Sequence, residues 1–222
     1  MRIYSNEVSI RMNSITAIVA AYNEEETIAS VIETVKSSDL IDYIIVISDG
    51  STDDTANIAS KYDIRVLEID TNKGKGAAVM KGLEYCRASD IVILLDADLI
   101  GLNKEHIEDL LLPIIEDRAD MTIGIFSGGR MSTDLAQRLT PFLSGQRAIK
   151  KDLLDKVRNK DINQYGLEAS ITKYVKNEKI RVKEVKLRKL THRTKEEKLG
   201  MLKGFKLRMK MYLDVAKALI KR

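Results

Sequence analysis

The sequence predicts an α/β protein with a mostly parallel central sheet and flanking helices. Three observations lead to this fold class. Short apolar runs rich in β-branched residues are nearly continuous, as expected of strands that are covered on both faces. Segments with apolar residues three or four positions apart lie between these runs and indicate helices. The two patterns alternate over residues 1–125, which favours right-handed parallel connections and a ligand site at the carboxyl ends of the strands.

Each element follows from its local pattern. Strands are expected at residues 15–21 (ITAIVAA), 43–48 (YIIVIS), 64–69 (IRVLEI), 91–95 (IVILL) and 121–126 (MTIGIF). The helices between them are expected at residues 25–37, 55–62, 76–88 and 104–117. The later sequence predicts a loop after residue 126, a return segment near 140–147, helices at 151–158 and 167–176, a basic strand at 180–190 and a final helix at 196–222.

Size and composition favour one domain that spans residues 1–222. The chain has a mass of 25.0 kDa, and a single core commonly extends to this size. With 44% hydrophobic and 32% charged residues and two prolines, collagenous, low-complexity and wholly disordered chains are excluded. No apolar stretch approaches the ~20 residues that span a bilayer, and no export signal is recognisable. We therefore expect a cytoplasmic protein.

Charge and ligand residues restrict the chemistry. Residues 1–125 contain 11 Lys and Arg against 23 Asp and Glu, a net charge of −12, which leaves +16 for residues 126–222. The acidic half can hold a cation and the basic half can hold anions. One cysteine, Cys86, and two histidines exclude an internal disulfide and a thiolate or multi-histidine zinc site. A metal would be held mainly by carboxylates, which favours Mg²⁺ or Mn²⁺.

Polar clusters follow three of the predicted strands and therefore meet at one edge of the sheet. Asp96 and Asp98 flank one residue, so in an extended strand their side chains point the same way. Their mutual repulsion would be relieved by a divalent cation that bridges to diphosphate oxygens. The alternative for Asp98 is that it caps the next helix.

The second strand ends at Asp49, which a tight turn at Gly50 follows. Ser51, Thr52 or Asp53 can cap the next helix, which leaves Asp49 able to accept hydrogen bonds from a base. No glycine follows the first strand, which argues against a Rossmann dinucleotide site, and residues 72–76 (NKGKG) lack the spacing of a P-loop.

Four segments, in this order, resemble the nucleotide-diphospho-sugar glycosyltransferases of the GT-A fold, family 2 type: residues 21–24 (AYNE), 49–53 (DGSTD), 72–76 (NKGKG) and 96–98 (DAD). The resemblance covers about residues 14 to 170. It implies a GT-A fold, with residues 1–125 as the nucleotide-sugar-binding half and 126–222 as the acceptor-binding half. The donor-binding residues that it implies are Ala21, Tyr22, Glu24, Asp49, Lys75, Asp96 and Ala97. It also implies that Asp98 binds the metal and takes part in catalysis.

The second half is similar to the acceptor region of glucosyl-3-phosphoglycerate synthases, in residues 141–148 (PFLSGQRA) and 165–168 (YGLE). This similarity implies acceptor contacts for Gly145, Gln146 and Arg147. In that group a later histidine completes the metal site. Here the candidate is His192, whereas His106 is expected to be exposed.

One departure from the family pattern concerns the catalytic base. Inverting members generally carry Glu-Asp near this point, but Glu168 is followed by Ala169. Either Glu168 is the base, or the reaction proceeds on the front face with retention and without a side-chain base.

Basic residues of the second half offer further anion contacts. Arg130 and Arg193 lie in segments where a guanidinium group could hold a phosphate or carboxylate, and Arg147 is the best candidate for such a contact. Lys150 and Lys151 are expected on a solvated basic surface. The final helix is amphipathic and cationic, and packing on the core or against a second copy is preferred over contact with anionic lipid. Nucleic-acid binding is not expected, because aromatic stacking residues are few.

The resulting hypothesis is transfer of a sugar from a uridine- or guanosine-diphosphate donor to a phosphate-bearing, phosphoglycerate-like acceptor with Mg²⁺ or Mn²⁺. A polyprenyl phosphate acceptor at the membrane surface is one alternative, and a catalytically silent nucleotide-sugar-binding protein is another. A sugar-1-phosphate nucleotidyltransferase would need a glycine-rich basic loop after the first strand, which residues 22–25 (YNEE) are not.

Overall fold

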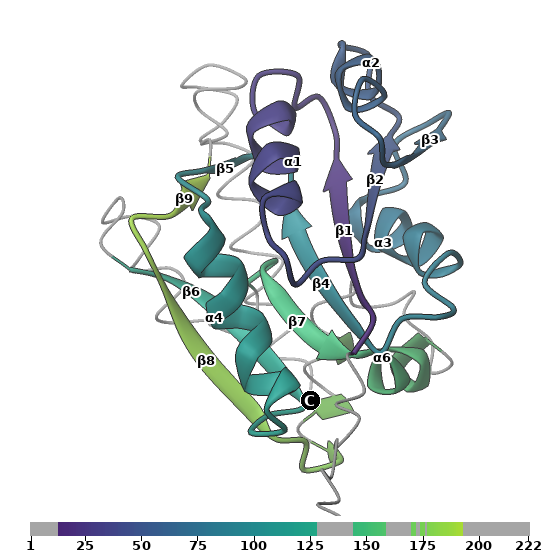
Figure 1. The fold of residues 1–222 in the computed structure, drawn as a ribbon. Helices are drawn as coiled ribbons and strands as arrows, with labels where there is room; N and C mark the ends of the chain where they lie inside the picture. Colours follow the sequence, from purple (N-terminus) through teal and green to yellow (C-terminus); the bar gives the residue numbers. More distant parts are fainter. Residues whose placement is uncertain (1–12, 128–143, 159–169, 172–173, 176, 193–222) are drawn as a thin grey trace, which may run out of the picture.

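The computed structural model describes residues 13–127, 144–158, 170–171, 174–175 and 177–192. Its centre is a seven-stranded sheet with the strand order β3-β2-β1-β4-β7-β6-β8 (Figure 1). Neighbouring strands are parallel except where β7 pairs with β4 and β6 in antiparallel orientation. The mostly parallel sheet with flanking helices that the sequence predicts is therefore confirmed.

The strands of this sheet are β1 (Ile15–Ala21), β2 (Tyr43–Asp49), β3 (Arg65–Ile69), β4 (Ile91–Asp96), β6 (Met121–Ser127), β7 (Arg147–Lys150) and β8 (Val182–Arg188). Two further strands, β5 (Leu99–Ile100) and β9 (Thr191–His192), pair only with each other among the described residues. The helices are α1 (Ile28–Lys36), α2 (Thr55–Ala59), α3 (Lys75–Leu83), α4 (Lys104–Ile115) and α6 (Lys151–Arg158).

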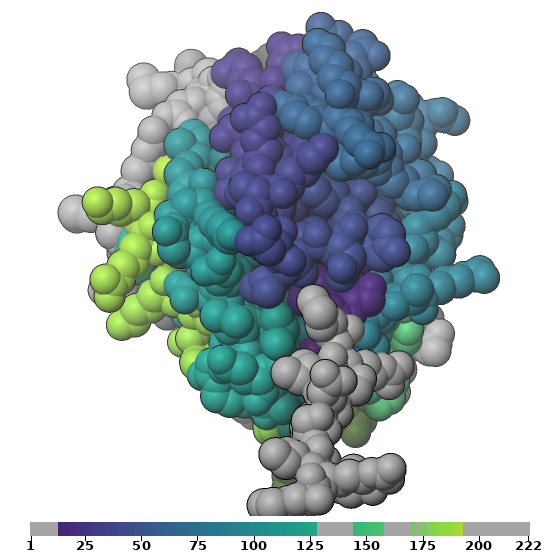
Figure 2. All heavy atoms as spheres, in the orientation of Figure 1, coloured from purple at the N-terminus to yellow at the C-terminus, as the bar shows by residue number. Residues whose placement is uncertain are grey.

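Two hydrophobic clusters cover the two faces of the sheet. On one face, Ala17 and Val19 of β1 pack with apolar residues of α1 and α4. Figure 2 shows these two helices lying side by side over that face. Ile18 points to the other face, where it packs with residues of α3 and α6. The alternation along β1 is that of a strand buried on both sides, which explains its continuous apolar sequence.

The strand register brings the predicted polar segments to one edge. Ala20 of β1 lies beside Asp96 of β4, and Ala21 lies beside Ser48 of β2. Because β1, β2 and β4 are parallel, the residues that follow them meet at their carboxyl ends. This edge is the place at which open parallel sheets bind ligands.

Helix boundaries differ from the sequence prediction where turns replace the first or last helical residues. The helix expected at residues 25–37 begins at Ile28, because the amides of Thr27 and Ile28 both donate to the Glu24 carbonyl at 3.1 and 2.9 Å. The helix expected at 76–88 is α3 and ends at Leu83. The next three amides donate to carbonyls three residues earlier, as in a 3₁₀ turn, and the α-helix does not continue.

Later segments are described in part. The basic strand expected at 180–190 is β8. The helix expected at 167–176 is described only at residues 170–171 and 174–175, and the final helix expected at 196–222 lies outside the described residues. Within the described part of the chain, no helix is long and apolar enough to cross a membrane.

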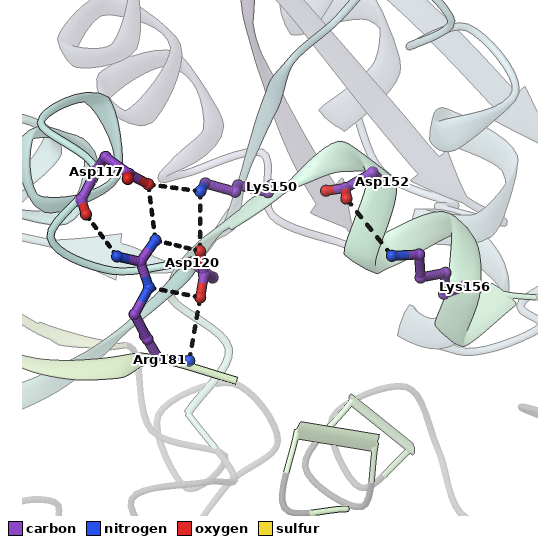
Figure 3. Close-up of polar contacts among 6 residues, drawn as sticks. All are labelled: Asp117, Asp120, Lys150, Asp152, Lys156 and Arg181. Carbon is purple, nitrogen blue, oxygen red and sulfur yellow. Dashed lines mark hydrogen bonds and ion pairs between the residues drawn. The ribbon is translucent and has the colours of Figure 1, made fainter. Parts of the chain in front are cut away.

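Three polar residues correct the sequence prediction. His106 was expected to be exposed, but it is buried, with 4% of its surface exposed. The reason is that it lies where α4 packs against the end of β8. Lys151 is 8% exposed and pairs with Asp155 at 2.6 Å. Lys150 is not simply solvated either, since it joins Asp117 and Asp120 in an ion-pair network (Figure 3).

Candidate functional site

The centre of the carboxyl edge is an ion pair between Lys75 and Asp96. Lys75 is the first residue of α3 and Asp96 is the last residue of β4. The side-chain amide nitrogen of Gln146 donates to Asp96 Oδ2 at 2.7 Å. Gly145 leaves room for this pair, because a Cβ placed on it would collide with Lys75 Nζ and both carboxylate oxygens of Asp96. The structure therefore brings together two predicted donor residues and two predicted acceptor residues.

Asp96 is held in its charged form at neutral pH. Burial on its own would raise the pKa of this carboxyl group, but the charge and hydrogen bond of Lys75, the amide of Gln146 and the charge of His192 outweigh it and hold the pKa below the ordinary value. The side chain is still 28% exposed. It can therefore accept a hydrogen bond from a bound hydroxyl group.

Gln146 is fixed at both ends of its side chain. Its Oε1 accepts from the Ser144 hydroxyl at 3.1 Å while its amide nitrogen donates to Asp96. The neighbouring Arg147 is fully buried and donates to the Ser144 carbonyl. Sequence reasoning missed Ser144, although its position two residues before a predicted contact residue is a usable signal for such a local hydrogen bond.

Asp49 orders the loop that leads into α3. Its carboxylate is 3% exposed and accepts hydrogen bonds from the amides of Lys73 and Gly74 at 2.9 and 2.7 Å. Gly50 has φ +70° and lies so close to the backbone of residues 71–72 that a side chain there would collide with it. Asp49 therefore lies at the expected edge, and each of its two carboxylate oxygens already accepts a hydrogen bond from the backbone.

The segment after β1 is cross-linked to the segment after β2. Asn23 has φ +55°, and its side-chain oxygen accepts from the Thr52 amide at 2.8 Å. The Ser51 hydroxyl accepts from the Asn23 amide at 3.1 Å, and the Thr55 hydroxyl accepts from the Glu24 amide at 2.8 Å. Ser51 and Thr52, which the sequence offered as helix caps, thus hold the first loop in place. These contacts leave Tyr22 47% exposed at the edge and Glu24 buried.

The two-residue pairing of β5 with β9 brings His192 to the same edge. His192 pairs with Leu99, the residue that follows Asp98. Its ring also lies against Phe126, with the ring centroids 5.6 Å apart and the planes tilted by 53°. Asp98 is not the cap of the next helix, because α4 is capped by Asn103. The two candidate metal ligands, far apart in the sequence, therefore lie on adjoining segments.

The donor set suits a hard divalent ion that is shared with a substrate. No group of three or more His, Cys, Asp or Glu side chains that could hold an ion occurs among the described residues. Mg²⁺ characteristically takes one or two protein carboxylates and completes its shell with phosphate oxygens and water. Asp98 offers one carboxylate and His192 one ring nitrogen, so an ion held by these two residues would need further ligands such as diphosphate oxygens.

The remaining predicted residues give less information about the site. Ala21 and Ala97 are buried next to this edge, at 3% and 2% exposure. Glu168, Arg130 and Arg193 lie outside the described residues. The predicted roles of these three side chains stay predictions.

Comparison with known proteins gives a family match over most of the chain. The family model described as glycosyl transferase family 2 matches residues 16–185. Glucosyl-3-phosphoglycerate synthase of Mycobacterium tuberculosis is 30% identical over 179 residues, which cover 64% of this chain and 55% of that protein. Poly-beta-1,6-N-acetyl-D-glucosamine synthase of Staphylococcus epidermidis is 32% identical over 95 residues, 40% of this chain and 23% of that protein. The chain thus spans about half the length of the first of these relatives.

Solved structures of the mycobacterial synthase share the fold. Its complex with Mn²⁺, uridine diphosphate and phosphoglyceric acid matches with a TM-score of 0.67 and 28% identity, over 82% of this chain and 71% of that chain. Its complex with Mg²⁺ and uridine diphosphate matches with a TM-score of 0.63 and 26% identity, over 82% and 72% of the two chains. The GT-A fold that the resemblance implied is confirmed.

Proposed function

Since the chain belongs to glycosyl transferase family 2, we propose that it transfers a sugar from a nucleotide-diphosphate donor to a small acceptor that bears a phosphate. The observation that supports this proposal is the β5–β9 pairing, in which His192 lies opposite Leu99, the residue after Asp98, near the edge occupied by Lys75 and Asp96. We propose uridine diphosphate as the donor nucleotide and a phosphoglycerate as the acceptor, because one solved structure of the mycobacterial synthase contains both.

The donor site in this proposal is formed by the loops after β1, β2 and β4. Ala21, Tyr22 and Glu24 border the nucleoside, and the exposed ring of Tyr22 offers a face on which a base can stack. Asp96 accepts a hydrogen bond from the ribose. Lys75, which pairs with Asp96 in this structure, is the proposed contact of a diphosphate oxygen, to which it would offer a compact positive charge.

Asp98 and His192 would hold Mg²⁺ or Mn²⁺ together with the diphosphate. The bound ion supplies positive charge that neutralises the departing diphosphate. The chain's own part is to place these two side chains on adjoining backbone segments and to keep Asp96 ionised beside them. The room at Gly145 is occupied by the Lys75–Asp96 pair, and Gly145 and Gln146 are the proposed acceptor contacts. Arg147, which was expected to contact the acceptor, is fully buried and instead holds this segment through its hydrogen bond to the Ser144 carbonyl. The base, if one acts, is proposed to be Glu168.

A thermal-shift panel tests the donor class and the role of the ion together. Uridine, guanosine, cytidine and adenosine diphosphates are added with and without Mn²⁺. A ligand at 100 times its Kd stabilises a folded protein by about 2.7 kcal/mol, which for a chain of this size raises Tm by about 5 to 10 °C. We expect this rise for uridine diphosphate with Mn²⁺, and the proposal fails if no diphosphate gives a metal-dependent rise.

Product formation tests the acceptor. Uridine-diphosphate glucose and 3-phosphoglycerate are incubated with the protein and Mn²⁺, and mass spectrometry detects the glycosylated acceptor. Asp98→Ala is expected to keep the melting temperature of the free protein but to lose turnover, since a well-placed electrostatic contact is worth about 3 to 4 kcal/mol in the transition state. Wild-type turnover by this variant in Mn²⁺ buffer would contradict the assignment of Asp98.

A further inference from the structure

His106 links the start of α4 to the segment that carries His192. The Asn103 side chain accepts from the His106 amide at 3.0 Å, and His106 Nδ1 accepts from the Asn103 amide at 3.3 Å. Because Nδ1 is an acceptor, the ring proton is on Nε2. This Nε2–H group donates to the Arg188 carbonyl, 2.9 Å away and 82 positions later in the sequence.

The Arg188 carbonyl marks the place where β8 ends and the chain turns toward β9. The next residue, Lys189, has φ +59°, and its amide donates to the Ser127 carbonyl at 2.9 Å. The Lys189 carbonyl lies so close to Gly101 that a Cβ there would be 2.7 Å from it. His192 follows three residues after Lys189. The direction in which β9 approaches Asp98 is therefore set at this turn.

The choice of histidine at position 106 has a physical reason. The third residue of a helix commonly returns a hydrogen bond to the capping residue, and Glu or Gln suffices for that task. A histidine ring has a second nitrogen on its far side, so it can close the cap and reach another segment at the same time. Because His106 is only 4% exposed, competition from water for both hydrogen bonds is reduced.

We propose that His106 is a positioning residue, which holds the turn at Arg188 and Lys189 and thereby orients His192 toward the metal. This inference rests on the proposed function, because it concerns the same ion. Among the described residues β9 pairs with β5 at two positions. The ring contact of His192 with Phe126 and the hydrogen bond from His106 to the Arg188 carbonyl are further contacts that place this segment. Groups that orient a metal ligand typically change metal affinity by 10 to 100-fold when they are removed.

Two substitutions of His106 separate its two hydrogen bonds. The variant His106→Asn carries a side-chain oxygen at the reach of Nδ1, so it keeps the bond to the Asn103 amide and loses the bond to Arg188. The variant His106→Gln carries an amide nitrogen at about the reach of Nε2, so it keeps the donor to Arg188. Asn103→Ala is the matched control, because it weakens the helix cap and leaves the tie to Arg188 in place.

The readout is Mn²⁺ affinity in the presence of saturating uridine diphosphate, measured from the electron paramagnetic resonance signal of free Mn²⁺. We expect His106→Asn to raise the Kd for Mn²⁺ about 10-fold or more, whereas His106→Gln and Asn103→Ala change it by less than about threefold. Affinity for uridine diphosphate without metal should be the same in all four proteins, which a general loss of structure would not allow.

Two results would overturn this inference and leave the proposed function standing. One is a wild-type Mn²⁺ affinity in His106→Asn, and the other is an equal loss of Mn²⁺ affinity in His106→Asn and Asn103→Ala. If the wild-type protein binds no Mn²⁺ in the presence of uridine diphosphate, the proposed function fails and this inference fails with it.

Discussion

Gly145 is the residue at which the smallest change should disturb the site. A methyl group there would occupy the space of Lys75 Nζ and of the Asp96 carboxylate. The Gly145→Ala variant must therefore displace the ion pair, while the fold should persist because the neighbouring atoms are the ends of side chains at an open edge. We expect uridine diphosphate affinity, measured by isothermal titration calorimetry, to fall about 10-fold or more, as for a loss of about 1.4 kcal/mol or more.

Gly82→Ala is the control for this variant. Its Cβ would enter the contact between α3 and the sheet, 2.9 Å from Ile47 Cδ1 and away from the carboxyl edge. It should change the melting temperature and leave nucleotide affinity unchanged. If Gly145→Ala binds the nucleotide as tightly as the wild type does, then Lys75 and Asp96 do not form the donor site.

At the residue scale, the predictions from sequence were correct for side chains at the ends of strands. They were wrong where the hydrogen-bond partner of a side chain is distant in the sequence. Asp49 and Asp96 reach the expected edge because strand ends can be located from apolar runs alone. His106 was expected to be exposed, because nothing near it in the sequence reveals the Arg188 carbonyl. Lys151 differs in that its spacing of four residues from Asp155 could have indicated their ion pair.

At the level of elements, an ion-pair network joins the ends of β6, β7 and β8 (Figure 3). Asp120 accepts from the Arg181 guanidinium at 2.7 and 2.9 Å and from Lys150 at 2.8 Å. The Arg181 hydrogen bonds, more than those of Lys150, hold the pKa of Asp120 well below its usual range, although partial burial opposes this. Asp117 contacts the same two cations but its side chain is 73% exposed.

This network predicts a pH-dependent stability. Because the pKa of Asp120 is lower in the folded chain than in the unfolded chain, its stabilisation is complete above about pH 4 and is lost as the pH falls below that value. We expect Asp120→Asn to lower the free energy of unfolding in urea by about 1 to 2 kcal/mol at pH 7 and by clearly less at pH 3.

Asp117→Asn serves as the comparison, because its exposed carboxylate is screened by water and its removal should cost less than that of Asp120. A loss for Asp120→Asn that is the same at pH 7 and pH 3 would show that the charge of Asp120 contributes nothing to stability.

The predicted elements also show which part of the fold depends on distant contacts. The strand at residues 15–21 has the same bounds in the structure, because seven consecutive residues provide a clear apolar pattern. The strands β5 and β9 have two residues each, too few for any periodicity. Their pairing, which decides where His192 lies, depends on the return of the chain through β8 and could not be predicted from local sequence.

For the whole molecule, the acidic and basic halves of the chain meet at the site. Asp49, Lys75 and Asp96 come from residues 1–125, whereas Gln146 and His192 come from the second half. Gln146, the residue before β7, donates to Asp96 at the end of β4, and β9 pairs His192 with Leu99, the residue after Asp98. A donor that binds with its ion must therefore contact segments that belong to both halves, and its binding should stabilise them together.

Hydrogen exchange measured by mass spectrometry can detect this coupling. Uridine diphosphate alone should slow exchange in residues 72–76, which Asp49 orders, but leave residues 188–192 unchanged, because no part of the nucleotide is expected to contact β9 directly. Addition of Mn²⁺ should slow exchange in residues 188–192 as well. At 100 times the Kd the slowing can reach about 100-fold, since binding then adds about 2.7 kcal/mol to the cost of local opening.

In Asp98→Ala the metal-dependent protection from exchange should disappear, while the nucleotide-dependent protection persists. Equal protection of residues 188–192 with and without Mn²⁺ would show that β9 is closed by its own pairing, and the ion would then have no part in joining the two halves.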